Sequence, residues 1–209
     1  FWWLRLIIVA CASILLGKYM LYMVLSPWYD FWVKFHYGER NRKYYPKVSV
    51  LIPAWNEEIG ILTTVQSLLK STYKNFELVI VNDGSTDNSD VIIREFIRKY
   101  YALLSSRPHA HHGDVSIVYK YQKNQGKGGA LNTALGFASG EIIMSIDGDC
   151  LVDKHAVANF VKYFRDPNVS AAVGNVKIGN TETILGTIQS LEFLFSFYCR
   201  YFFTLSFNK

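Results

Sequence analysis

Two carboxylates flank a single glycine in Asp147-Gly148-Asp149, directly after an apolar run that ends at Ile146. Because side chains alternate along an extended chain, both carboxylates point to the same side, and the glycine lets a ligand come close. Two hard oxygen donors without a larger protein cage suit Mg²⁺ or Mn²⁺, whose other ligands are water and phosphate oxygens. A helix cap is the competing interpretation of such a pair, and the rest of the sequence bears on the choice.

Three further polar motifs stand where other predicted strands end. They are Ile52–Glu58 (IPAWNEE), Val81–Asp87 (VNDGSTD) and Gln125–Asn132 (QGKGGALN). The carboxyl ends of strands at one edge of an α/β sheet converge on one crevice, so these polar groups can meet in space. The combination favours a ligand site over a set of unrelated turns.

Each of these motifs contains a side chain suited to one part of a nucleotide. Asp83 could accept hydrogen bonds from a base N–H or a ribose hydroxyl, and Asn56 and Glu57 could face the same ligand. Trp55 offers a flat face for a base, although a core or interface tryptophan is the alternative. Lys127 lies in a glycine-rich turn before a predicted helix, where backbone N–H groups and the helix dipole favour an anion. Its glycine spacing is not that of a P-loop, and a solvated surface lysine is the alternative.

These features together describe a base-binding wall, an anion-binding turn and an acidic pair. A nucleoside diphosphate fits all three, and a metal that bridges the diphosphate would neutralise charge as this group leaves. The sequence therefore predicts a nucleotide site with a divalent cation, Mg²⁺ or Mn²⁺.

The elements that must position these residues alternate between apolar runs and longer amphipathic stretches from Val48 onward, which predicts a mostly parallel α/β sheet with helices on its faces. The predicted strands are 48–52, 76–81, 115–121, 141–146 and 169–176. The predicted helices are 57–70, 87–104, 127–138 and 153–165, with a further aromatic-rich helix in 183–207.

Composition limits the class of protein. A chain of 209 residues that is 50% hydrophobic and 16% aromatic can bury a core in one α/β domain with a short appendage. Its net charge of +5 is mild and gives no nucleic-acid signature. The cysteines show no paired spacing, so we expect free thiols in a reducing compartment. They are Cys11, Cys150 and Cys199.

The first 27 residues predict a transmembrane helix. Leu6 to Leu25 is apolar with Lys18 as its only charge, long enough to cross about 30 Å of hydrocarbon. A signal peptide or a buried helix is the alternative. Residues 28–47 form a basic juxtamembrane linker, and positive charge beside a membrane marks the cytoplasmic side. We therefore expect a cell-membrane protein with its globular domain in the cytoplasm.

The motifs PAWNEE, VNDGSTD, GKGGALN and DGD, in this order and spacing, resemble glycosyltransferase family 2, the inverting enzymes of the GT-A fold. The chain is most similar to membrane-bound processive β-glycan synthases, which make poly-N-acetylglucosamine, chitin oligosaccharides, hyaluronan or cellulose. The resemblance implies a GT-A (nucleotide-diphospho-sugar transferase) domain with a Rossmann-like sheet over 48–182, followed by an aromatic-rich acceptor-side or interfacial helix in 183–209.

The resemblance also implies roles for individual residues. Asp149 would bind the metal together with Asp147, Gly174–Val176 would lie near the sugar, and Gln189–Arg200 would approach the acceptor. The residues that would line the nucleotide-sugar pocket are Pro53, Ala54, Trp55, Asn56, Glu57, Asp83, Lys127 and Asp147.

The chain departs from the family in two respects. No tryptophan follows Trp55, so the family's Gln-x-x-Arg-Trp segment, which helps to hold the growing glycan, is absent, and no acidic motif of the family's general-base type follows Asp149. A base contributes about 10²- to 10⁴-fold to such a reaction, so we expect this chain, which resembles an N-terminal fragment, to be nearly inert in transfer.

The function expected from the resemblance is inverting transfer of a sugar, by resemblance N-acetylglucosamine, from a UDP-sugar to a growing β-linked polysaccharide at the membrane. Transfer of a single sugar to a lipid carrier is one alternative. A nucleotide-sugar-binding regulator without catalysis is another.

Overall fold

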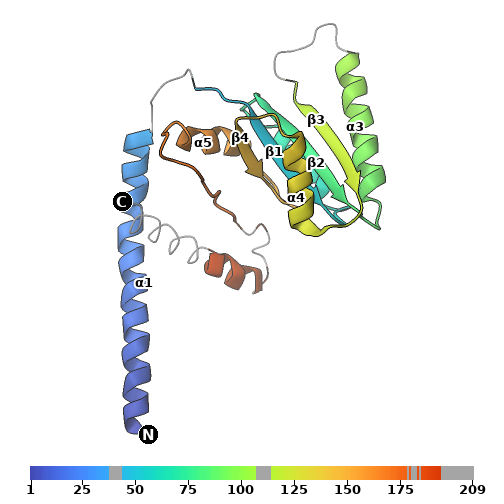
Figure 1. Cartoon of the computed structure of the whole chain (residues 1–209). Coiled ribbons are helices and arrows are strands. Elements are labelled where there is room, and N and C mark those ends of the chain that lie inside the picture. The colour runs from blue at the N-terminus through green and yellow to red at the C-terminus, as the bar shows by residue number, and fades with distance from the viewer. Residues whose placement is uncertain (38–43, 107–113, 178, 180–182, 184, 194–209) are drawn as a thin grey trace. The chain divides into compact units, whose positions relative to one another are not determined.

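A computed structural model describes residues 1–37, 44–106, 114–177, 179, 183 and 185–193 (Figure 1). The chain divides into two compact units, which are described separately below. One unit comprises Phe1–Arg40 with Val173–Lys209, and the other comprises Asn41–Ala172. All the strand-end motifs lie in the second unit.

The second unit is a parallel four-stranded sheet with helical connections. Its strands are ordered β3-β2-β1-β4, and every neighbouring pair is parallel. The elements run in the order β1 (Val48–Ala54), α2 (Ile61–Leu69), β2 (Phe76–Asp83), α3 (Ser89–Ser105), β3 (Ser116–Gln122), α4 (Gly126–Phe137), β4 (Ile142–Ser145) and α5 (Ala156–Tyr163). The predicted α/β class with a parallel sheet is confirmed.

The strand register brings the motifs to one edge of the sheet. Ala54 at the end of β1 is level with Asn82 in β2, and Asp83 at the end of β2 is level with Gln122 at the end of β3. β4 ends at Ser145, which is level with Leu51. Because all four strands run the same way, the segments that follow them leave the sheet at the same edge.

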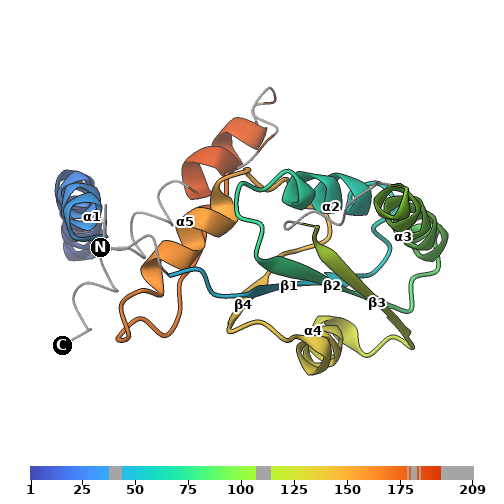
Figure 2. The same ribbon diagram turned by 90° about the horizontal axis from the view of Figure 1, so that it is seen from above.

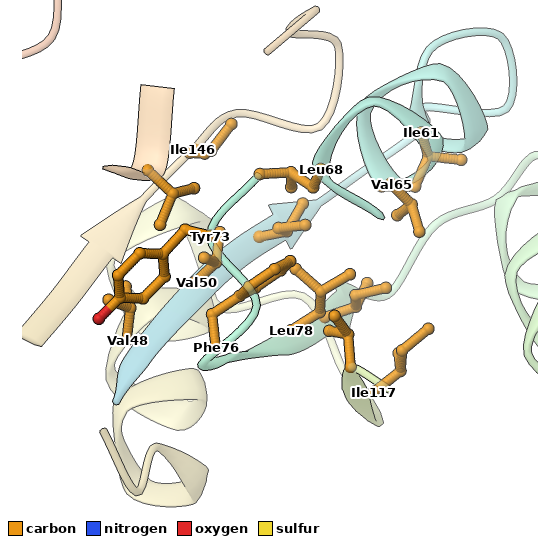
Figure 3. Close-up of a cluster of buried hydrophobic side chains, with 14 of the residues drawn as sticks. Val48, Val50, Ile61, Val65, Leu68, Tyr73, Phe76, Leu78, Ile117 and Ile146 are labelled. Atoms are coloured by element: carbon orange, nitrogen blue, oxygen red, sulfur yellow. The ribbon is translucent and has the colours of Figure 1, made fainter. Parts of the chain in front are cut away.

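Helices cover both faces of the sheet. Figure 2 shows α2, α3 and α5 on one face and α4 on the other. Alternate β1 residues such as Val50 and Ile52 pack with Ile61 of α2 in the larger core, on the α2 side of the sheet, and all three are fully buried. Figure 3 shows this cluster between α2 and the strands. Leu51 points the other way, into a smaller core with Ala130 of α4.

Pro53 lies inside β1 although the sequence predicted that it would end the strand. In a parallel strand, alternate residues direct their hydrogen-bonding groups to the same neighbour. The Leu51 carbonyl accepts a bond from the Ile146 N–H at 3.0 Å, so Pro53, two residues later, faces the β4 side beyond the end of that strand. A proline is tolerated there because no ladder bond needs its missing N–H.

The strand predicted at 169–176 is absent: residues 169–177 have no regular secondary structure. Their valines suit a strand by composition, but strand propensity is expressed only where a neighbour pairs and packs. This prediction from local composition was wrong.

The first unit contains α1, a helix of 36 residues from Trp2 to Tyr37. Its segment Trp2–Leu21 is long and apolar enough to cross a membrane, with a mean hydropathy of 1.9 and no part buried. Residues 185–193 are also helical. The remainder of the aromatic segment, including Cys199 and most of 189–200, lies outside the described residues.

Candidate functional site

The segment after β1 is tied to the segment after β2 by a series of hydrogen bonds. The Glu57 N–H donates to Ser89 Oγ at 2.9 Å, and the Glu58 N–H donates to Asp87 Oδ2 at 3.1 Å. In return, the Thr86 N–H donates to Asn56 Oδ1 at 2.8 Å. These bonds join the two segments, and α2 begins after them, at Ile61 and not at residue 57 as predicted.

Asn56 takes a left-handed backbone conformation, with φ of 57°. Asparagine adopts this conformation more readily than most residues, but it still carries a cost. The bonds from the Thr86 N–H and from the Asn56 N–H to Ser85 Oγ, at 3.0 Å, hold it in place. The Asn56 side chain is thus engaged between the two segments, where it fixes the backbone next to Trp55.

Trp55 stands at this edge with 55% of its surface exposed. The two residues before it face inward to different degrees: Ala54 is buried and Pro53 is half-buried. An indole that is carried on a segment fixed by hydrogen bonds and is exposed to solvent is suited to stacking on a planar ring. This exposure does not fit a tryptophan buried in the core, which was one alternative for Trp55.

Asp83 is buried at the end of β2, with 3% of its surface exposed. Its Oδ1 accepts bonds from Gln122 Nε2 at 2.7 Å and from the Gln125 N–H at 2.9 Å. The neighbouring Gly84 has φ of 71° and lies so close to the next segment that an added Cβ would be 2.7 Å from the Asn124 nitrogen. Asp83 therefore fixes the turn that leads into α4 and Lys127.

The acidic turn, Asp147–Asp149, follows β4 and packs on the segment after β1. A Cβ on Gly148 would be 3.1 Å from Glu57 Cγ and 3.5 Å from the Pro53 carbonyl oxygen, and a Cβ on Gly60 would be 2.9 Å from Asp149 Cα. Gly60 is thus required by close approach to the Asp149 backbone, whereas a Cβ at residue 148 would require the Glu57 side chain to shift. Asp147 and Asp149 are exposed on either side of the buried Gly148.

Lys127 reaches the acidic turn from the first turn of α4. Its Nζ lies 2.6 Å from Asp147 Oδ1, and both side chains are more than half exposed. The structure thus brings the predicted anion-binding lysine together with the predicted acidic pair. An exposed ion pair of this kind has little net stability, so an anionic ligand can compete for the lysine at small cost.

The electrostatics of this edge are dominated by carboxylates. Burial, together with the charges of Asp149, Asp147 and Asp87, raises the pKa of Glu57 above its usual value. Burial and the same two aspartates of the acidic turn also raise the pKa of the Cys150 thiol. A cation bound at this edge would relieve the repulsion among these groups.

The donor atoms fit a divalent cation that is shared with a ligand. Within the described part of the chain, no three histidine, cysteine, aspartate or glutamate residues gather as a preformed metal site. Asp149 and Asp147 instead offer exposed carboxylate oxygens, the hard donors that Mg²⁺ and Mn²⁺ prefer when phosphate and water complete the shell.

Two site-forming residues were missed by the sequence analysis. Thr64 Oγ1 donates to the Gly148 carbonyl at 2.8 Å, and Ser67 Oγ accepts the Val152 N–H at 3.0 Å. In the sequence, these two residues are marked only by their hydroxyl groups and their i, i+3 spacing beside the apolar face of α2. They belong to none of the motifs described above.

The comparison with protein families agrees with this geometry. The model described as "Glycosyl transferase family 2" matches residues 49–207, most of the chain. The chain belongs to glycosyltransferase family 2. Its parallel sheet with flanking helices is the GT-A-type fold expected for this family.

Curated family 2 relatives include poly-beta-1,6-N-acetyl-D-glucosamine synthases. The protein from Staphylococcus epidermidis is 33% identical over 147 residues, which cover 70% of this chain and 32% of the relative. The protein from Staphylococcus aureus strain COL is 32% identical over the same length. This family 2 chain thus spans about a third of the length of these relatives.

A solved structure with the same arrangement is the mannosyltransferase PcManGT from Pyrobaculum calidifontis, in complex with GDP-Man and Mn²⁺. It is 27% identical with a TM-score of 0.55, and the match covers 76% of this family 2 chain and 47% of that chain.

Proposed function

We propose that this chain carries the donor-binding site of a membrane-bound glycosyltransferase. The enzyme would transfer N-acetylglucosamine from a UDP-sugar to a growing β-linked polysaccharide, with inversion at the sugar carbon. The observation that carries the proposal is the meeting of Lys127 with the Asp147–Asp149 turn, which packs on the segment bearing Glu57.

The nucleoside would lie against Trp55 and Asp83. The exposed indole would stack on the base, and the Asp83 carboxylate, held by Gln122 and Gln125, would accept a bond from a base N–H. Asn56, with Pro53 and Ala54, would contribute by holding the backbone that carries Trp55.

The diphosphate would bind at Lys127 and the acidic turn. Its negative charge would replace Asp147 as the partner of the Lys127 ammonium, which also lies at the N-terminal end of α4 where an anion is favoured. Asp149, with Asp147, would hold Mg²⁺ or Mn²⁺, which would neutralise charge on the departing diphosphate. Glu57 would stabilise the position of this turn through its contact with Gly148.

Inversion requires a base that removes the proton of the acceptor hydroxyl as the hydroxyl attacks the sugar. The residues above bind and orient the donor, and we assign none of them this role. We therefore expect the 209-residue chain to bind the donor and to transfer slowly.

The sugar and the acceptor follow from the relatives. The curated synthases act in making poly-β-1,6-N-acetyl-D-glucosamine, which supports an N-acetylglucosamine donor and a glycan acceptor. PcManGT was solved with GDP-Man, so the base must be tested directly. Since α1 could span a membrane and the basic segment 28–47 favours the cytoplasmic side, we place the protein in the cell membrane with the sheet unit in the cytoplasm.

The test separates base, diphosphate and metal contributions. UDP, GDP, ADP and uridine are titrated into the 209-residue chain in detergent, with Mn²⁺ and without it. The proposal predicts that UDP binds more tightly than GDP or ADP, that uridine binds weakly, and that Mn²⁺ strengthens only the diphosphates. GDP preference would redirect the proposal to another donor, and no nucleotide binding by the folded chain would refute it.

A matched pair of variants assigns the metal effect. Asp149→Ala should abolish the gain in UDP affinity that Mn²⁺ provides. Glu141→Ala removes an exposed carboxylate at the opposite end of β4 and should leave that gain unchanged. Release of N-acetylglucosamine from its UDP-sugar, measured on the same chain, separates a slow enzyme from a binding-only regulator.

A further inference from the structure

Two hydroxyl side chains of α2, Thr64 and Ser67, are buried beside the acidic turn. Thr64 is fully buried and Ser67 is 7% exposed. Both lie outside the four strand-end motifs. Burying a hydroxyl is costly unless it is hydrogen-bonded, so the partners of these two groups indicate what they do.

Both hydroxyls bond to the backbone of the segment that follows β4. Thr64 Oγ1 donates to the Gly148 carbonyl at 2.8 Å, and its distance to the carbonyl of Gly60, the residue before α2, is longer, 3.4 Å. Ser67 Oγ accepts the Val152 N–H at 3.0 Å and donates to the Thr64 carbonyl at 2.8 Å. The two bonds therefore hold the segment 148–152 at both ends, with Asp149 between them.

The helix that makes these bonds is itself fixed on the sheet. Ile61, Val65 and Leu68 are at most 2% exposed and pack against the strands (Figure 3). Gly60, just before the helix, permits the backbone of Asp149 to approach within contact distance. α2 thus anchors the acidic turn on the hydrophobic core.

We propose that Thr64 and Ser67 are positioning residues that set the placement of the Asp149 carboxylate for a divalent cation bound together with the donor diphosphate. The inference rests on the proposed function. Asp149 is exposed and the protein supplies few ligands, so without these bonds the turn would have to be ordered when the cation binds. Ordering the turn beforehand removes that cost from binding.

The test is the gain in UDP affinity that Mn²⁺ provides, measured by titration of the 209-residue chain in detergent. Thr64→Val keeps the shape of the side chain but cannot donate to Gly148. It should reduce the Mn²⁺-dependent gain about tenfold, the size expected for one buried hydrogen bond, while UDP affinity without metal stays unchanged. Thr64→Ser keeps the hydroxyl and should restore most of the gain.

Two further variants complete the design. Thr63→Val alters the neighbouring, exposed threonine of the same helix and should have no effect on either affinity. Ser67→Ala, which cannot accept the Val152 N–H, should reduce the Mn²⁺-dependent gain in the same way as Thr64→Val. Should Thr64→Val also lose metal-free UDP binding, Ser67→Ala decides in its place.

The outcomes separate the inference from the function on which it rests. A Mn²⁺-dependent gain that is the same in Thr64→Val, Ser67→Ala and the parent would overturn the positioning role while leaving the nucleotide site intact. Equal losses with and without Mn²⁺ in both variants would show a structural role only, and would also overturn it. A parent chain that binds no UDP would refute the proposed function and the inference together.

Discussion

Glu77 should be a main electrostatic contributor to the stability of the sheet unit. It is 4% exposed in β2 and accepts bonds from Ser49 Oγ at 2.6 Å and the Ser139 N–H at 2.7 Å, with Lys47 Nζ 2.7 Å away. Burial by itself would raise the pKa of Glu77, but the bonds from Lys47, Ser49 and Ser139 outweigh it and lower the pKa from 4.5 to about 2.

The magnitude follows from this shift. At 1.36 kcal/mol per pKa unit, the ionised Glu77 contributes about 3 kcal/mol to the free energy of unfolding. Because the pKa is lowered on folding, the contribution is complete above the unfolded pKa and is lost as the pH falls from roughly 5 to 2. Glu77→Gln keeps the size of the side chain and removes the charge, so it should cost about 3 kcal/mol at pH 7 and progressively less towards pH 2.

Urea unfolding of the chain in detergent, followed by circular dichroism at several pH values, measures this difference. Glu95→Gln is the control, because Glu95 forms an exposed i, i+4 pair with Lys99 on α3 and should leave the free energy of unfolding nearly unchanged. A Glu77→Gln variant as stable as the parent at pH 7 would refute the reasoning. So would a deficit that does not shrink in acid.

Three other predictions concern the site. Gly60→Ala places a Cβ 2.9 Å from Asp149 Cα and should lower Mn²⁺-dependent UDP affinity at least about tenfold, because the Asp149 carboxylate is then misplaced. The control Gly136→Ala, in open space on α4, should leave this affinity unchanged, and titration of both variants with UDP measures the difference. Lys127→Met should weaken UDP about tenfold or more through loss of a charge-assisted bond but leave uridine binding unchanged, and an equal effect on both ligands in competition binding would argue against a diphosphate contact. Trp55→Ala should cost uridine about 1–3 kcal/mol of stacking, and Trp55→Phe should retain most of it; calorimetry with uridine would contradict stacking if both variants bound like the parent.

The parallel sheet and the meeting of the motifs could be predicted because both depend on local signals. Apolar runs closed by polar turns define β1 and β2, and parallel strands must release their carboxyl ends at the same edge. The same rule predicts that Lys127 and Asp147 lie near each other, and their Nζ and Oδ1 atoms are 2.6 Å apart.

The remaining features depend on contacts that are distant in sequence. The extension of β1 through Pro53 depends on where β4 ends, and the absence of a strand at 169–176 depends on pairing rather than composition. Thr64 and Ser67 bond to residues about 85 positions away. A threonine in a helix gives no sign of such a partner, so these residues could be found only in the folded chain.

The most direct test of the central claim is the affinity of the 209-residue chain for UDP with and without Mn²⁺, compared between the parent, Asp149→Ala and Glu141→Ala. The account predicts UDP binding that Mn²⁺ strengthens in the parent and in Glu141→Ala, with the Mn²⁺ effect lost in Asp149→Ala. A Mn²⁺ effect that survives in Asp149→Ala, or no UDP binding by the folded parent, would contradict it.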